Sequence, residues 1–277
     1  MTHLPREEYV EQAYMFHSLG HRLQSNDPVQ RLLAHTREEI LATTKLPMAI
    51  DYLLAELSHS GSISAAMANM PHYFTPFQTF LIAQAEDDRG RMDMFMSVKL
   101  LEAEARYRAK DAGRVGLFFF QFEILCRNRL SYDLGLAAIA GDPVYDDAWN
   151  TWLMDVRQKI GIVDLSDLIY IHSKFYVMEQ ERRGNAVADD HVVLFGEKEG
   201  RIALANRRKE PLYFFAALQR QLNYPEVPRL KPKDENLERI PKLLRTVERL
   251  ETRVKLLEDE QRETGIDLSK FYKKPGQ

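Results

Sequence analysis

Val115-Gly-Leu-Phe-Phe-Phe-Gln-Phe-Glu-Ile-Leu-Cys126 is the most apolar stretch of this 277-residue chain. Gln121 and Glu123 interrupt it, and it is shorter than the ~20 apolar residues that a membrane-spanning helix needs. A run of this length and composition is typical of a helix buried in a protein core. We therefore expect a mainly α-helical body, either a bundle or an array of helical hairpins, built around this helix, and no membrane partner.

Helical periodicity continues on both sides of this stretch. From Met92 to Lys110, apolar side chains at helical spacing are expected to pack inward, and four charged side chains are expected to face solvent. The packing residues are Val98, Leu101 and Ala105, and the solvated ones are Glu102, Glu104, Arg106 and Arg108. Residues 77–108 resemble a tetratricopeptide-type hairpin in length and turn, although the signature Trp, Leu-Gly and Tyr positions are not matched.

The composition is that of an ordinary globular protein. With 45% apolar residues, 29% charged residues and a net charge of -3, the chain is neither disordered nor suited to coating nucleic acid over its whole surface. Its one cysteine, Cys126, excludes an intramolecular disulfide, which fits a reducing compartment. We expect a cytoplasmic location.

The sequence divides into five segments. Residues 1–184 are predicted to form the helical body, in which Asp164 begins a last helix that runs to about Arg183. Residues 185–223 are predicted to contain a small β-hairpin and a short helix packed on the body. The hairpin would pair 191–195 with 201–205 through the glycine-bounded turn 196–200. A basic, proline-rich spacer follows at 224–238, then a coiled-coil helix at 239–264 and a tail at 265–277.

The coiled coil is the strongest pattern in the sequence. β-Branched residues alternate with leucine at heptad positions a and d, a choice that favours parallel dimers. These predicted interface residues are Ile240, Leu243, Val247, Leu250, Val254 and Leu257. Since they bury well only against a partner helix, we expect a homodimer.

Four residues near the N-terminus could bind a metal. His17 and His21 are four residues apart, a spacing that zinc sites use on helices, and Glu56-Leu-Ser-His59 has the Glu-x-x-His spacing of di-iron bundles. The sequence has no second Glu-x-x-His, so ordinary surface and capping roles explain the four residues better. The sequence therefore predicts no cofactor.

A basic segment at 201–233 is a candidate for binding nucleic acid, because its cations lie close to aromatic residues. The cations named for this patch are Arg207, Arg208, Lys209, Arg229, Lys231 and Lys233. A solvated surface or a patch for an acidic protein explains the same residues.

No phosphate-binding loop, nucleophile elbow or Cys-x-x-Cys is present in the sequence, so no common enzyme class is indicated and no catalytic residue is predicted. The leading hypothesis is a helical scaffold or adaptor that self-associates through its tail and binds another protein. A metal-binding or enzymatic bundle is the first alternative, and nucleic-acid binding through 201–233 is the second.

Overall fold

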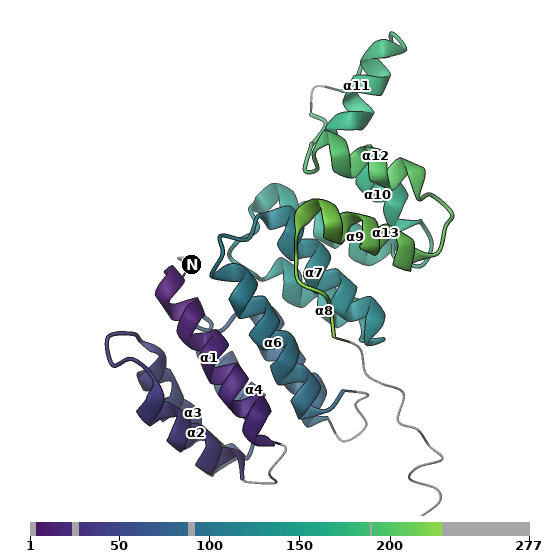
Figure 1. Cartoon of the computed structure of the whole chain (residues 1–277). Helices are drawn as coiled ribbons and strands as arrows, with labels where there is room; N and C mark the ends of the chain where they lie inside the picture. The colour runs from purple at the N-terminus through teal and green to yellow at the C-terminus, as the bar shows by residue number, and fades with distance from the viewer. Residues whose placement is uncertain (1–3, 24–27, 88–91, 189, 229–277) are drawn as a thin grey trace, which may run out of the picture. The chain divides into compact units, whose positions relative to one another are not determined.

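The computed structural model describes residues 4–23, 28–87, 92–188 and 190–228. The chain divides into two units, Met1–Arg229 and Leu230–Gln277, and all described residues belong to the first. The described part is mainly helical, as the sequence predicts, and contains thirteen helices (Figure 1). These are α1 (Arg6–Arg22), α2 (Val29–Glu39), α3 (Leu46–Ser60), α4 (Ile63–Ala68), α5 (Pro76–Glu86), α6 (Met94–Arg108), α7 (Arg114–Arg127), α8 (Tyr132–Ala140), α9 (Asp147–Lys159), α10 (Leu165–Ile171), α11 (Lys174–Arg182), α12 (Glu197–Ala205) and α13 (Pro211–Leu222).

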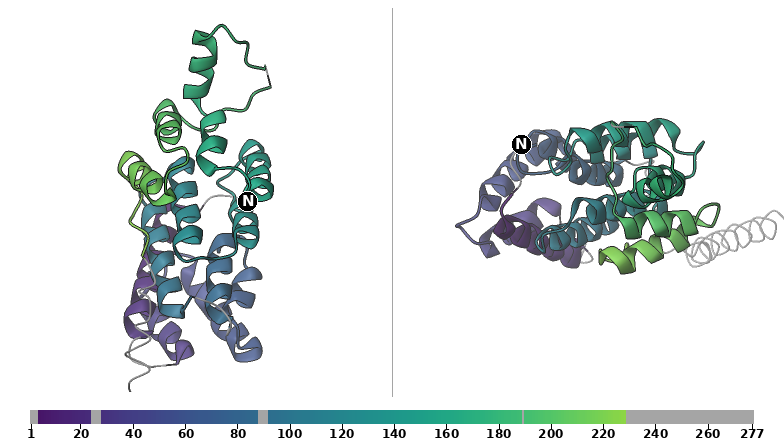
Figure 2. Two further views of the ribbon diagram at one scale, coloured as in Figure 1. Left: turned by 90° about the vertical axis from the view of Figure 1, so that its right-hand side faces the viewer. Right: turned by 90° about the horizontal axis from the view of Figure 1, so that it is seen from above.

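The helices pack both on their neighbours in sequence and on distant helices. Helix α2 packs on α3, α4 on α5 and α8 on α9, whereas α1 lies along α6, which follows it by more than 70 residues (Figures 1 and 2). Helix α6 also contacts α5 and α7, so it occupies a central place. Helix α11 projects from the others in Figure 1, and none of its residues is buried.

Helix α7 is the buried core helix that the sequence predicts. All ten residues from Gly116 to Leu125 are buried, and α6, α8 and α13 pack against it. Phe118 lies at the centre of an aromatic cluster with Trp149, Trp152 and Phe195, at ring-centroid distances of 5.1–6.3 Å. Burial on all sides explains why this sequence is apolar all round rather than amphipathic.

The predicted β-hairpin is wrong. Its second strand, Arg201–Ala205, belongs to α12, and Gly200 lies inside that helix rather than in a turn. A Cβ at Gly200 would lie 2.1 Å from the Ser173 hydroxyl, so this glycine permits close packing of α12 on Ser173. Glu197 and Glu199 suit the first turn of a helix because they face its positive end.

The long helix expected from Asp164 to Arg183 is broken at Ser173. The Ser173 side chain accepts a hydrogen bond from the Tyr176 N–H and caps α11. The segment before α12 then runs back past this break: the Leu194 N–H donates to the His172 carbonyl at 2.9 Å, and Lys174 N–H donates to the Phe195 carbonyl at 2.9 Å. Phe195 is thereby anchored in the core, where it is 1% exposed.

Candidate functional site: a cationic groove beside α6

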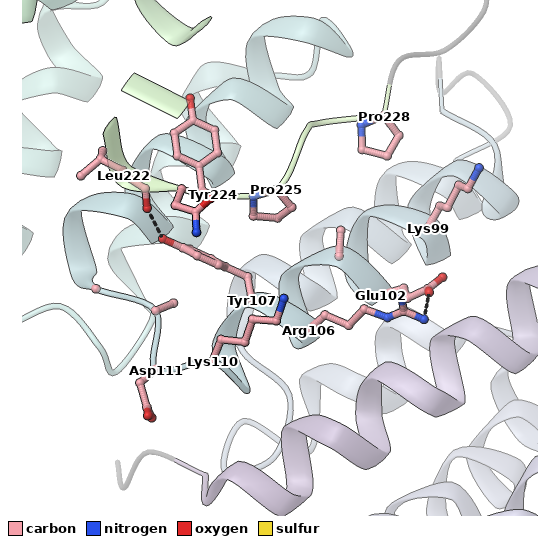
Figure 3. Close-up of a pocket in the computed structure, with 14 residues that line it drawn as sticks. Lys99, Glu102, Arg106, Tyr107, Lys110, Asp111, Leu222, Tyr224, Pro225 and Pro228 are labelled. Carbon is pink, nitrogen blue, oxygen red and sulfur yellow. Dashed lines mark hydrogen bonds and ion pairs between the residues drawn. The ribbon is translucent and has the colours of Figure 1, made fainter. Parts of the chain in front are cut away.

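An open groove of about 640 Å³ lies beside α6 (Figure 3). We call it the cationic groove. One wall is the outer face of α6 and the turn after it, and the other is the chain that follows α13. Its lining residues are Lys99, Glu102, Ala103, Arg106, Tyr107, Lys110, Asp111, Ala112, Gly113, Leu222, Asn223, Tyr224, Pro225 and Pro228.

Three cations give the α6 wall its character. Lys99 and Arg106 are seven residues apart, so they lie on one face of α6, and Lys110 follows in the turn just after the helix ends at Arg108. All three are exposed. The wall ends where Asp111 adopts a left-handed conformation with φ 56°, which stops the helical turn.

The opposite wall is an extended segment held by two buried side chains. Helix α13 ends at Asn223, whose φ of 53° reverses the chain direction. The Tyr224 hydroxyl then donates to Glu123 Oε2 at 2.7 Å and lies 3.1 Å from the Phe215 carbonyl oxygen, and Val227 is 1% exposed. These residues belong to the start of the expected spacer, and they fix it against the body as a wall of the groove.

Tyr107 connects the two walls. Its hydroxyl donates to the Leu222 carbonyl at 3.4 Å, and burial raises the pKa of this phenol above its ordinary value. A Cβ at Gly116 of α7 would lie 2.1 Å from the Tyr107 hydroxyl, so glycine is required there for the phenol to cross α7. Figure 3 draws the Tyr107–Leu222 hydrogen bond as a dashed line.

The charges in the groove leave an excess of positive charge. Arg106 contacts Glu102 at 2.6 Å, and His17 Nδ1 lies 3.0 Å from the same carboxylate. Lys99 and Lys110 have no ion-pair partner among the described residues; the Lys99 amine lies 5.3 Å from the centre of the Phe95 ring. Together the lining cations Lys99, Arg106 and Lys110 outnumber the lining carboxylates Glu102 and Asp111 by one, and this net positive charge attracts carboxylates or phosphates.

A second cluster of charge lies in the core rather than on the surface. The Arg108 guanidinium donates to Glu104 Oε1 at 2.9 Å and to Asp142, and Gln121 donates to the same Glu104 oxygen at 2.8 Å. Glu104 and Arg108, which the sequence pattern assigns to solvent, are 0% and 3% exposed. The cluster joins α6, α7 and the turn after α8, and its burial makes it a structural site.

The four metal candidates do not form a site. His17 contacts Glu102, whereas His21 and His59 are exposed on different helices. Within the described ranges, no three histidine, cysteine or acidic side chains come together in a way that could hold a metal ion. The described structure therefore does not bring His17, His21, Glu56 and His59 together as a metal site.

Among the described cations of the predicted basic patch, Arg207 is engaged through its side chain, whereas the side chains of Arg208 and Lys209 are exposed. Arg207 forms an ion pair with Asp167 and lies over the Tyr170 ring at 5.7 Å, and the Arg208 backbone N–H donates to Asp164 at 3.0 Å. The other members, Arg229, Lys231 and Lys233, lie outside the described residues, as do all six predicted coiled-coil residues, so the coiled coil stays a prediction.

Sequence reasoning missed the cationic groove. The available signal was the spacing of Lys99 and Arg106 on one helical face, with Lys110 just after it, but the second wall follows more than 110 residues later. Only tertiary structure brings Leu222–Pro228 against α6, so the spacing alone reads as an ordinary solvated face.

Comparisons with protein families, with curated proteins and with solved structures find no match to this chain. Among the helices of the described part, none is both long enough and apolar enough to cross a membrane.

Proposed function

We propose that this protein is a helical scaffold or adaptor that binds another protein in the cationic groove and self-associates through its C-terminal segment. The observation that carries the proposal is the groove, a cavity of about 640 Å³ with two cations, Lys99 and Lys110, that lack ion-pair partners among the described residues. Its volume falls within the range of about 300–1,000 Å³ typical of ligand sites. It can therefore hold a short segment of a partner rather than a folded domain.

The heptad pattern supports self-association. Valine at a and leucine at d bury their side chains only against another helix, and each buried side chain contributes roughly 1.5–3 kcal/mol. Two copies of the body would then be presented by one assembly, which is the arrangement that a scaffold requires.

A photo-crosslinking amino acid tests the groove in cells that express the protein. Placed at Ala103 or Asn223, both of which line the groove, it should give a discrete adduct with another protein. The same group at Ala55, which is exposed on α3, should not. The adduct should disappear in a Lys99→Glu/Lys110→Glu variant. Adducts that form equally at Ala55, or that survive the charge reversal, would contradict a partner site in the groove.

A further inference from the structure

We propose that the cationic groove binds an extended acidic segment of a partner protein in which three carboxylates occupy alternate positions, acid-x-acid-x-acid, so that all three face α6. This inference rests on the proposed function, because it names the chemistry of the partner that the groove binds. It is carried by the positions of Lys99, Arg106 and Lys110 and by the nature of the facing wall.

The spacing follows from helix geometry. Lys99 and Arg106 are seven residues apart, or about 10.5 Å at 1.5 Å per residue, and Arg106 and Lys110 are about 6–8 Å apart across the turn that ends α6. An extended peptide advances about 3.3 Å per residue. Side chains on one face of an extended peptide recur every two residues, or about 6.6 Å, so three carboxylates at alternate positions span about 13 Å and lie within reach of the long Lys99, Arg106 and Lys110 side chains.

The facing wall favours recognition through side chains. Pro225 and Pro228 have no backbone N–H, so the extended wall lacks donors at both positions and makes a poor template for a β-ladder. Charge pairs along α6 must then supply the affinity. Because these pairs are exposed, binding should weaken as salt is added.

The groove fits an acidic peptide better than a nucleic acid. Single strands need aromatic faces on which bases stack. Tyr224 is only 3% exposed and its hydroxyl is bound to Glu123, while Tyr107 is fixed between Gly116 and Leu222. Both tyrosines are therefore held by the body through their hydroxyls, which leaves little freedom for either ring to stack on a base.

The test uses fluorescence anisotropy with the full-length protein and labelled peptides. The probes are two Gly/Ser peptides of equal composition, one with three aspartates at alternate positions and one with the three aspartates adjacent. The alternating peptide should bind up to about fivefold more tightly than the clustered peptide, in which the middle carboxylate faces away from α6. Equal affinity for both would show that the groove reads only net charge and would overturn the spacing.

Matched variants locate the binding. Lys99→Gln/Lys110→Gln should weaken binding about 25-fold, since each exposed ion pair contributes up to about fivefold. Lys198→Gln/Lys209→Gln removes the same charge from exposed positions outside the groove and should leave affinity unchanged. Circular dichroism should show both variants folded. An equal loss in the two double variants would overturn the assignment to the groove.

The remaining outcomes separate this inference from the proposed function. A single-stranded oligonucleotide could also bind more tightly than the peptides and lose this binding in the Lys99→Gln/Lys110→Gln variant. That result would make a nucleic acid, rather than a peptide, the ligand of the groove. Peptides that fail to bind while Ala103 still yields a charge-dependent protein adduct would overturn the acidic spacing and leave the adaptor function standing. If the crosslinked adduct also failed to form, both the acidic-segment inference and the proposed adaptor function would be overturned.

Discussion

Replacing Arg108 by methionine should destabilise the body severely, because it leaves Glu104 and Asp142 buried together without a cation. Both carboxylate side chains are fully buried, and Arg108 contacts both. Removing one partner of a buried ion pair costs about 3–5 kcal/mol. With a urea m-value of ~3 kcal/mol/M for a unit of this size, the unfolding midpoint should fall by about 1–1.7 M.

Arg106 provides a matched control on the same helix. It pairs with Glu102 at the same i,i+4 spacing, but its side chain is 58% exposed. Arg106→Met should therefore change the free energy of unfolding by no more than about 1 kcal/mol. The two variants make the same substitution two residues apart and differ chiefly in burial.

A second variant tests the charge count in the core cluster, which contains two carboxylates and one guanidinium. Glu104→Gln should cost much less than Arg108→Met, because Arg108 and Asp142 remain as a one-to-one pair and the amide still accepts a hydrogen bond. Urea unfolding followed by circular dichroism measures all three variants. An Arg108→Met protein as stable as Arg106→Met, or a Glu104→Gln protein as unstable as Arg108→Met, would refute the reasoning.

Three further expectations concern packing, reactivity and assembly. Gly116→Ala should lower the free energy of unfolding by about 1–3 kcal/mol, because the new Cβ meets the Tyr107 hydroxyl. A Cβ at Gly113 has nothing within 4 Å, so Gly113→Ala should unfold at a higher temperature than Gly116→Ala. Burial raises the pKa of the Cys126 thiol to about 12, so a thiol reagent at pH 8 should modify the native protein far more slowly than the unfolded one. Because the thiol ionises more readily when unfolded, stability should also fall as the pH rises above about 8.5. Leu250→Glu should shift the mass measured by light scattering toward monomer with the body still folded, and an unchanged mass would place the interface in the body.

The helical architecture was predictable because its main signals are local. The apolar composition of Val115–Cys126 is enough to indicate a buried helix, and the structure places this stretch in α7 at the core. Ser131 and Asp146 cap α8 and α9 through their side chains, as their residue types favour. These features need no knowledge of the tertiary fold.

The failures depend on contacts between distant residues. Gly200 looks like a turn residue, but it is needed because Ser173 packs against α12. Glu104 and Arg108 have the same spacing as Glu102 and Arg106, so periodicity cannot tell which pair is buried. The deciding partner is Asp142, which lies 34 residues beyond Arg108. The groove escaped prediction for the same reason.

The two parts of the proposed function make a joint prediction about avidity. Exposed charge pairs give each groove modest affinity, but a dimer holds two grooves, and linked sites can raise overall affinity by about 10²–10⁴-fold. A peptide carrying two acidic segments on a long flexible linker should therefore bind wild type far more tightly than a single segment does. Leu250→Glu should abolish this advantage and leave the affinity for the single segment unchanged, because the substitution lies outside the body that forms the groove. If the substitution weakened the single segment equally, the tail would contribute to the groove itself, and assembly and recognition could not be treated as separate functions of the chain.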